Sequence, residues 1–269
     1  MPASEVAASW LFTVTATSST GSTTTSTQTV TESAPPFTLS LNWSGFVVPS
    51  SGALITDASG DWTVPTLNCP VTPGSGEFTW IGIGGNGSST GALLQTGIVD
   101  TCVDGIQHDN AVWEEWPDEQ NAWDVFNDFP VSPGNTIAAY VYELNNGQWE
   151  TVVENLSTGL TGIMVTGEGW GVSSGGPTGS FIEQGSTADL SYSGGYTAEW
   201  IVEDYTQVSV DGPLEPFADY GTVTFTGITT TLSSWSLTAN EAIGIEQNGK
   251  MISTPSAPSG DGFSVSYTG

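Results

Sequence analysis

Residues 138–153 read AAYVYELNNGQWETVV, and this stretch decides the fold class. The runs 138–144 and 148–153 are rich in aromatic and β-branched residues, which favour extended strands. Between them, Asn145-Asn146-Gly147 supplies the residue types that adopt the left-handed conformations of a tight turn. Two strand-like runs joined by such a turn predict a β-hairpin.

The same pattern recurs along the rest of the chain. Residues 242–247 and 250–253 flank Asn248-Gly249, which is a second hairpin signal. Further strands are predicted at residues 79–83, 198–204, 222–226 and 264–268. No segment keeps a helical period for more than about two turns. We therefore predict an all-β fold, an antiparallel sandwich of two sheets of the concanavalin-A-like or jelly-roll type.

The N-terminal part of the chain has a different composition. Residues 14–34 are dominated by Ser and Thr and run into Pro35-Pro36. Such a segment cannot fill a core and is typical of a linker, a glycosylated stalk or the remnant of a pro-segment. The preceding residues 10–14 could be an added strand or the end of a removed segment. We assign residues 1–37 to an N-terminal extension and residues 38–269 to the sandwich domain.

The balance of charges is extreme. The 269 residues include 29 Asp and Glu but a single Lys or Arg, Lys250, so the formal net charge is −28 at pH 7. Charged residues make up only 11% of the chain, so acids are not in excess and it is the bases that are missing. Carboxylates protonate below about pH 4, and the net charge then approaches zero without becoming strongly positive. This composition predicts a protein that works in an acidic medium. We expect it to be a monomer.

The same composition excludes two classes of partner. Binding to nucleic acid or to an anionic membrane surface requires a basic face, which one basic residue cannot supply. Insertion into a bilayer requires a run of about 18 apolar residues, and the sequence has none. We therefore predict neither nucleic-acid binding nor membrane insertion.

The two cysteines, Cys69 and Cys102, could pair or remain buried thiols. We favour the disulfide, which would stabilise the fold by roughly 3–4 kcal/mol. His108 is the only histidine, and with two distant cysteines it does not make a metal site. Residues 82–87 match a dinucleotide-binding fingerprint as letters, but a Ser-rich turn follows where a helix is required. We predict no metal and no cofactor.

Two acidic segments lie in aromatic surroundings, at residues 112–117 and 198–204. Side chains on a strand alternate between faces, so Glu199, Ile201 and Glu203 share one face. A carboxylate on an otherwise apolar strand costs free energy when it is buried unpaired, which makes it a candidate for chemistry. The plain alternative is a set of solvated acids along a sheet edge.

A glycosidase is one candidate function for these acids. Glu203 lies four positions after Glu199, which is about 13 Å along a strand, whereas glycosidase acid pairs lie roughly 5–9.5 Å apart. A glycosidase would therefore need Glu203 together with an acid from a neighbouring strand. The 11 Trp residues and the Ser/Thr-rich segment also leave open a non-catalytic module that binds polysaccharide or serves at a cell surface.

Eight segments form an ordered series along the sandwich domain. They are Asn42-Trp43-Ser44-Gly45, Trp62-Thr63-Val64-Pro65, Trp80-Ile81-Gly82-Ile83, Leu93-Leu94-Gln95-Thr96-Gly97, residues 111–117, residues 154–159, Ala198-Glu199-Trp200-Ile201-Val202-Glu203 and Pro216-Phe217-Ala218. The segment at 198–203 is the most specific. In this order the segments resemble the eqolisin family, acid-acting glutamic peptidases with a β-sandwich fold.

The resemblance implies roles for individual residues. Glu203 matches the catalytic glutamate and would be the general base, and Gln95 matches the catalytic glutamine and would be its partner. Trp80, Glu114 and Trp116 match substrate-binding positions, although Trp116 stands where a tyrosine is usual. The implied function is a secreted acid endopeptidase that hydrolyses protein or peptide substrates without a cofactor.

The chemistry of these two residues fits the implied roles. A carboxylate can activate water and then return the proton to the leaving amine, and a primary amide can donate to an oxyanion without titrating. With an unperturbed pKa of about 4.3, only about 5% of a glutamate is ionised at pH 3. Glu203 must therefore keep a low pKa, or the pH optimum must lie higher. Gly84 and Val99 replace acids that are usual in the family, which predicts an altered subsite preference or pH profile.

Overall fold

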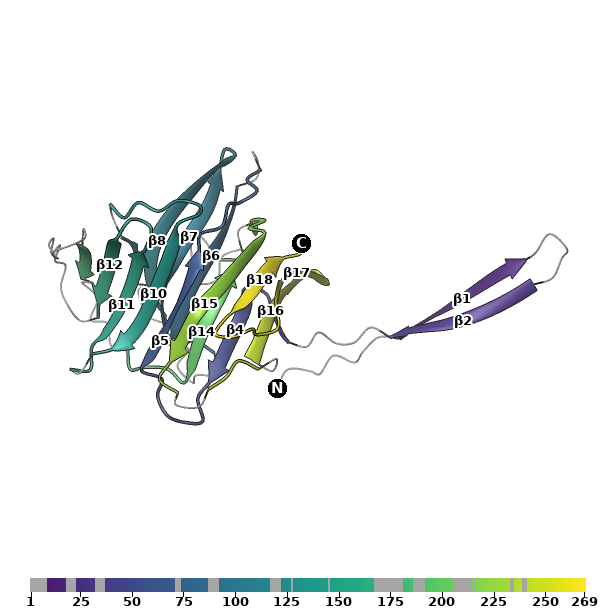
Figure 1. The fold of residues 1–269 in the computed structure, drawn as a ribbon, viewed down its shortest axis with the longest axis horizontal. Coiled ribbons are helices and arrows are strands. Elements are labelled where there is room, and N and C mark those ends of the chain that lie inside the picture. Colours follow the sequence, from purple (N-terminus) through teal and green to yellow (C-terminus); the bar gives the residue numbers. More distant parts are fainter. Residues whose placement is uncertain are drawn as a thin grey trace. The chain divides into compact units, whose positions relative to one another are not determined.

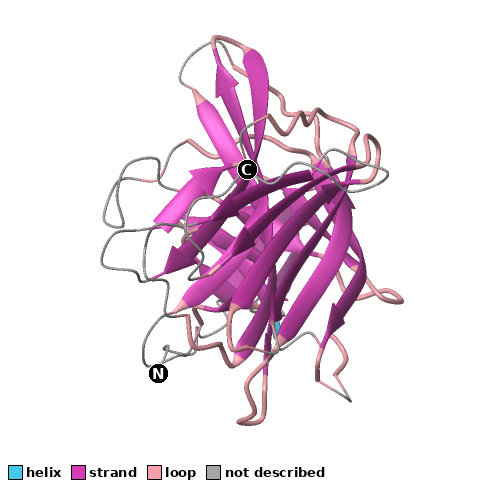
Figure 2. Cartoon of the chain, turned by 90° about the vertical axis from the view of Figure 1, so that its left-hand side faces the viewer, coloured by secondary structure: helices cyan, strands magenta, loops and turns pink. Residues whose placement is uncertain are grey.

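The structure is a computed structural model of the chain. It describes residues 9–17, 23–31, 37–70, 74–86, 92–116, 122–126, 128–144, 146–166, 181–185, 192–205, 214, 216–232, 235–238 and 241–269. The chain forms two compact units, Met1–Pro36 and Phe37–Gly269. The elements in the described parts are β-strands (Figure 1, Figure 2). Within those parts, no helix is long and apolar enough to cross a membrane.

The first unit contains a β-hairpin. β1 (Ser9–Thr17) pairs antiparallel with β2 (Thr23–Thr31). β1 includes residues 10–14, for which an added strand was one of two interpretations. β2 lies in the Ser/Thr-rich segment and was not predicted as a strand. Threonine is β-branched and favours an extended backbone even where it has no core to fill.

The second unit is a sandwich of two layers (Figure 1). The first layer holds β13 (Phe181–Gly185), β12 (Leu160–Val165), β11 (Trp149–Asn155), β10 (Thr136–Glu143) and β5 (Asp57–Thr63), in that spatial order. The second layer holds β9 (Ala122–Val125), β8 (Ile106–Trp116), β7 (Leu93–Val103), β6 (Ser75–Gly84), β14 (Thr197–Glu203), β4 (Trp43–Pro49), β16 (Ala242–Gln247), β17 (Lys250–Pro255) and β18 (Phe263–Tyr267), and β3 (Thr38–Ser40) pairs with β16. The pairs β12–β13 and β3–β16 are parallel, and the other strand pairs among the described residues are antiparallel. The predicted two-sheet β-sandwich is confirmed.

β15 (Thr222–Thr230) joins the two layers. Residues 222–225 pair with β18, and the strand pairs with β5 from Thr226 onward. The register shifts between Thr226 and Thr229, and Gly227 in this bulge has a φ of +58°. A bulge bends and twists a strand, and glycine adopts a positive φ without the steric cost that a Cβ atom brings. The bulge therefore lets one strand pass from the second layer to the first.

Both predicted hairpins are present. β10 and β11 pair from Ile137 to Glu143, as the stretch 138–153 predicts, although Asn145 of the turn lies outside the described residues. β16 and β17 are joined by Asn248 and Gly249, whose φ values are +53° and +74°. Two positive φ values are what a type I′ turn requires, and its twist matches that of the flanking strands.

The main core lies between the two layers. Trp200 and Val202 of β14 point into it from one side, and Ala139 and Val141 of β10 point into it from the other. The indole N–H of Trp200 donates to the backbone carbonyl of Ser59 in β5 at 2.8 Å. This bond crosses between the layers and satisfies a polar group that burial would otherwise leave without a partner.

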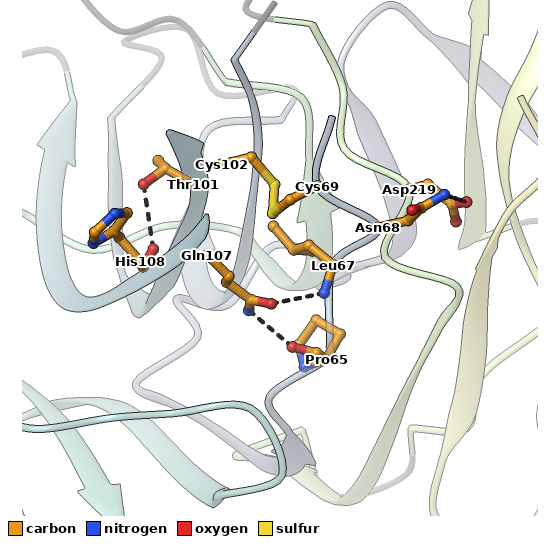
Figure 3. The surroundings of a disulfide bond; sticks show 9 residues. All are labelled: Pro65, Leu67, Asn68, Cys69, Thr101, Cys102, Gln107, His108 and Asp219. Carbon is orange, nitrogen blue, oxygen red and sulfur yellow. Dashed lines mark hydrogen bonds between the residues drawn. A yellow bond between two sulfur atoms is a disulfide. The ribbon is translucent and has the colours of Figure 1, made fainter. Parts of the chain in front are cut away.

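A disulfide joins Cys69 to Cys102, with Cα atoms 5.3 Å apart (Figure 3). It ties the loop that follows β5 to the end of β7. Gln107 of β8 holds the same loop, because its side chain accepts a hydrogen bond from the Leu67 amide at 2.7 Å and donates to the Pro65 carbonyl at 3.0 Å (Figure 3).

Replacing both cysteines by alanine is expected to lower the free energy of unfolding by about 3–4 kcal/mol, because the unfolded chain regains the freedom of the open loop. Urea denaturation of the parent and the double variant at pH 4 measures the difference. The parent, treated with a reducing agent at the same pH, should fall to the level of the variant. A loss of about 1 kcal/mol or less would mean that hydrogen bonds such as those of Gln107 suffice to hold the loop.

Candidate active site

Glu203 is the last residue of β14, a strand in the middle of the second layer. Trp200 and Val202 of this strand lie in the main core, whereas Ile201 belongs to a separate apolar cluster that also contains Trp80. Because side chains alternate along a strand, Glu203 points to the same side as Ile201. We call this side, which faces away from the first layer, the outer face of the second layer.

Both oxygens of the Glu203 carboxyl group accept a side-chain hydrogen bond. Asn42 Nδ2 donates to Oε1 at 2.9 Å, and Trp80 Nε1 donates to Oε2 at 2.7 Å. Asn42 directly precedes β4, and Trp80 lies in β6, so the two donors come from the two strands that flank β14. The Trp43 ring packs edge-on against the Trp80 ring, with centroids 5.0 Å apart. These contacts hold the carboxyl group from both sides.

Burial raises the pKa of Glu203 to about 8. The negative charge of Glu114 also raises this pKa, and the hydrogen bonds from Trp80, Trp43 and Asn42 lower it. The expectation that Glu203 keeps a low pKa is therefore wrong, because the N–H donors do not outweigh the loss of water around the carboxyl group. The other expectation, that the pH optimum lies higher, stays a prediction.

Gln95 lies in β7, and Glu114 lies directly opposite it in β8. Gln95 Nε2 donates to Glu114 Oε2 at 2.7 Å. The Gln95 side chain is only 2% exposed, and its amide oxygen has no hydrogen-bond partner in the described part of the chain. The site therefore holds a buried amide whose nitrogen is bound by a carboxyl group.

Trp80 connects Glu203 with Gln95. Its strand, β6, lies between β14 and β7, and Gly82 of β6 is directly opposite Gln95. A Cβ atom at Gly82 would lie 2.8 Å from the Trp80 ring and 3.1 Å from Gln95 Cβ. The glycine therefore leaves room for the indole beside Gln95. Trp80 thus binds Glu203 through its N–H group, and its ring lies beside Gly82, the residue opposite Gln95.

The structure describes the surroundings of four of the five residues that the sequence assigns to the site. These are Glu203, Gln95, Trp80 and Glu114. The backbone of Trp116 pairs with Leu93, and the Trp116 side chain lies outside the described residues. The roles of all five in the reaction remain predictions.

Asn42 and Trp43 contact the site but received no role from the sequence. Their segment, residues 42–45, was part of the family-like series, which is the only signal that pointed to them. Asn42 is 161 residues away from Glu203 along the chain. A local pattern of residues does not reveal which strand will lie next to β14, so these contacts depend on the tertiary structure.

The structure describes the surroundings of Gly84 and Val99, the two positions that depart from the family pattern. Gly84 has a φ of +96°, and a Cβ atom there would lie 2.1 Å from the backbone oxygen of Ala92, so no side chain fits this backbone. Val99 is partly exposed and packs against the apolar cluster of the outer face. Its neighbour Asp100 is fully buried and points the other way, into the sandwich.

Asp100 belongs to a second group of acids, which we call the buried carboxyl cluster. Glu77 of β6 lies opposite Asp100 of β7, and Asp100 lies opposite Asp109 of β8. Glu77 and Asp100 are fully buried. The Thr79 hydroxyl donates to Glu77 Oε2 at 2.9 Å. The Asp100 carboxyl group is a hydrogen-bond neighbour of the carboxyl groups of Glu77 and Asp109.

Burial raises the pKa of Glu77 to about 7 and raises the pKa of Asp100 well above its ordinary value. The charges of Glu77 and Asp109 raise the pKa of Asp100 further. Carboxylate oxygens are acceptors only, so these neighbouring groups can hydrogen-bond to one another only when protons are present. Among the described residues, no group of three or more His, Cys, Asp or Glu side chains is placed to hold a metal ion.

Five Trp side chains are buried in the part of the chain whose side chains the structure describes: Trp62, Trp80, Trp113, Trp149 and Trp200. Trp80 belongs to the apolar cluster of the outer face, and the other four lie in the main core. The number of Trp residues is therefore poor support for a polysaccharide-binding surface. His108 is exposed, and its backbone oxygen accepts a hydrogen bond from the Thr101 hydroxyl at 3.2 Å (Figure 3).

Comparison with known proteins assigns the chain to a family. The peptidase A4 family matches residues 41–169 and 172–267. Aspergillopepsin-2 of Aspergillus niger is 32% identical over 249 residues, which cover 85% of this chain and 78% of that protein.

Solved structures show the same fold. Scytalido-glutamic peptidase bound to a transition-state analogue inhibitor superposes with a TM-score of 0.64 at 23% identity, over 85% of this chain and 98% of that chain. SCP-B, a member of the eqolisin family in complex with the tripeptide Ala-Ile-His, superposes with a TM-score of 0.56 at 22% identity, over the same shares of the two chains. The chain belongs to the peptidase A4 family, the glutamic endopeptidases called eqolisins.

Proposed function

We propose that this endopeptidase cleaves protein or peptide substrates by direct attack of water, with Glu203 as general base and acid and Gln95 as the donor to the oxyanion. One observation carries the proposal. The Glu203 carboxyl group is held by an N–H donor on each oxygen, and the ring of Trp80, one of these donors, lies beside Gly82, which is directly opposite Gln95. The carboxyl group and the amide thus belong to β14 and β7, the two strands that flank β6, and both project from the outer face, where a peptide bond could lie between them.

The reaction consists of two proton transfers around one tetrahedral intermediate. Glu203 takes a proton from water while the water oxygen bonds to the carbonyl carbon of the scissile peptide. The carbonyl oxygen gains the negative charge and accepts a hydrogen bond from Gln95, a donor typically worth about 2.7–4 kcal/mol. The C–N bond then breaks, and Glu203 returns the proton to the leaving nitrogen. No bond forms between enzyme and substrate.

The proposal also includes the residues that contact the peptide substrate and secretion of the enzyme into an acidic medium. Trp80, Glu114 and Trp116 are assigned to substrate contacts, and the tripeptide bound to SCP-B supports a peptide as the ligand of this fold. The formal net charge of −28 supports secretion into an acidic medium, where the carboxylates that repel one another at neutral pH are protonated.

The raised pKa values of Glu203 and of the buried carboxyl cluster predict how activity depends on pH. A general base must be ionised, and the ionised fraction of Glu203 rises about tenfold per pH unit below its pKa. Activity per folded molecule should therefore rise with pH across the acidic range. The upper limit is then set by the fold, because the buried carboxyl cluster opposes folding once the unfolded chain ionises.

Replacing Trp80 by phenylalanine is expected to move the acidic limb of kcat/KM to higher pH by about one to two units. The change removes the N–H donor to Glu203 Oε2, so the pKa of Glu203 rises. Initial rates on a peptide substrate at intervals from pH 2 to 8 measure this limb, because the pKa of Glu203 is about 8. Trp235→Phe is the matched control, because Trp235 stacks on Trp200 away from the site. If the limb stays in place in Trp80→Phe, Trp80 does not set the charge of Glu203.

A further inference from the structure

We propose that Glu114 is a positioning residue, which decides which end of the Gln95 amide faces the substrate. The inference rests on the proposed function, because it concerns how Gln95 presents its N–H group to the oxyanion. Gln95 and Glu114 are direct neighbours across β7 and β8, and Gln95 Nε2 donates to Glu114 Oε2 at 2.7 Å.

The argument starts from the shape of an amide. Its oxygen and its NH2 group have similar size, and a half-turn of the terminal torsion exchanges them. The two orientations differ in chemistry, because the nitrogen donates to an oxyanion while the oxygen would repel it. An enzyme that uses glutamine in this way needs a group that distinguishes the two ends.

Glu114 makes this distinction when it is ionised, because a carboxylate has only acceptor oxygens; Glu114 acts on Glu203 as such a negative charge. The amide can bond to it only through Nε2, and the reverse orientation would bring Gln95 Oε1 against a negative oxygen. One hydrogen of Nε2 is then used by Glu114. The second hydrogen of the same nitrogen remains for the oxyanion.

Other groups of the described chain do not make this choice. Gln95 is 2% exposed, so water has little access to its amide, and Oε1 has no partner among the described residues. On the side of β6 its neighbour is Gly82, which has no side chain to contribute. The orientation of the amide therefore depends on Glu114.

Glu114 also acts on Glu203 through its charge. This charge raises the pKa of Glu203, which is otherwise set by burial and by the N–H groups of Trp80, Trp43 and Asn42. A variant that keeps an acceptor but loses the charge can separate the two effects. Loss of the correct amide orientation should lower kcat. Loss of the Glu114 charge should shift the acidic limb of the pH profile of kcat/KM.

The main test is the variant Glu114→Leu, which removes the acceptor. We expect kcat to fall by about 10²-fold or more, approaching the loss caused by Gln95→Leu, because the amide no longer presents Nε2 reliably. KM should change less than threefold or so, because the interaction is made in the transition state. Asp124→Asn in β9 is the matched control for loss of an acid and should keep parental kinetics.

A double variant decides whether Glu114 acts through Gln95. In the Gln95→Leu background, Glu114→Leu should cause no further fall in kcat. The resemblance to the family assigns Glu114 to substrate contact, and the present inference gives it instead a role that acts through Gln95. If the two losses multiply, or if Glu114→Leu changes mainly KM, the assignment to substrate contact stands and the inference is wrong. Unchanged kcat in Glu114→Leu overturns it as well. Thermal unfolding of each variant confirms that the rates refer to folded protein.

The variant Glu114→Gln gives a separate readout. Its amide oxygen can still accept from Gln95 Nε2, so part of the kcat lost in Glu114→Leu should return. The charge is gone, so the acidic limb of kcat/KM should move to lower pH as the pKa of Glu203 falls. A limb that does not move would contradict the coupling between these two acids. The kcat comparisons between the Glu114 and Gln95 variants do not depend on Glu203 as the base, whereas the shift of the limb does. Loss of cleavage in Glu203→Gln tests the base separately, so failure of the inference and failure of the proposed function can be distinguished.

Discussion

Replacing Glu203 by glutamine is expected to lower kcat by about 10²–10⁴-fold or more, because the variant lacks both the base that activates water and the acid that protonates the leaving amine. The change is nearly isosteric, and a glutamine oxygen can still accept one of the hydrogen bonds that Asn42 and Trp80 donate. The variant should therefore stay folded. The measurement is digestion of an acid-denatured protein substrate between pH 2 and 6.

Two further variants make this result specific. Glu143→Gln removes an exposed acid from β10 and should keep parental activity. Glu199→Gln changes the other glutamate on the same face of β14, which is fully buried. If Glu203→Gln cleaves as fast as the parent while Glu199→Gln is inactive, the base has been assigned to the wrong residue.

The remaining outcomes separate the alternative functions. A parent that releases reducing sugar from a polysaccharide but cleaves no protein would favour a glycosidase using Glu203. A parent that binds polysaccharide without cleaving any substrate would favour a non-catalytic module. Loss of cleavage in Glu203→Gln, with the fold retained, would support the proposed peptidase mechanism and leave substrate preference as the next question.

The second large effect concerns stability, which is expected to fall as the pH rises from 4 to 7. The pKa of Glu77 rises from an ordinary value of 4.5 to about 7 in the folded protein. Below pH 4.5 the folded and unfolded states both hold the proton, so the stability is fully present. Between pH 4.5 and about 7 only the folded state holds it, so the free energy of unfolding falls with rising pH.

The expected loss from Glu77 alone is about 3 kcal/mol, because each pH unit is worth about 1.4 kcal/mol while only the folded state holds the proton. Asp100 and Glu199 are also fully buried with raised pKa values, so they act in the same direction. Urea denaturation at intervals between pH 4 and 7 measures the sum of these effects. A flat or rising profile would remove the case for adaptation to acid.

The double variant Glu77→Gln with Asp100→Asn tests the buried carboxyl cluster itself. Amides cannot ionise, so the loss of stability between pH 4 and 7 should shrink by about 3 kcal/mol or more. The comparison uses this difference between two pH values, so a general effect of the substitutions on packing cancels. If the double variant loses as much stability as the parent, the cluster does not cause the pH dependence.

Surface repulsion is the competing explanation, and Asp104→Asn controls for it. Asp104 is exposed in the turn between β7 and β8 and has a φ of +51°, a conformation that asparagine tolerates well. The variant removes one negative charge from the hairpin that carries Asp100 and Asp109. Its pH profile should match that of the parent if burial, rather than total charge, is the cause.

The amino-acid sequence determined the parts of this protein that depend on local geometry. The turn at Asn248-Gly249 follows from residues that tolerate positive φ, and the opposite orientations of Trp200 and Glu203 follow from the period of two along a strand. The roles assigned to Gln95 and Glu203 came from the ordered resemblance to a family. The local pattern alone left Glu203 and its neighbouring acids equally compatible with a glycosidase or with solvated acids along a sheet edge.

Only the tertiary structure decided which groups meet. Register between strands arises from long-range pairing and from burial of a whole face, so the sequence does not reveal that Asn42 and Trp80 bind Glu203 or that Glu114 binds Gln95. For the same reason, the raised pKa of Glu203 was not foreseen. A pKa depends on the water that neighbouring strands exclude, and that exclusion exists only when the layers have come together.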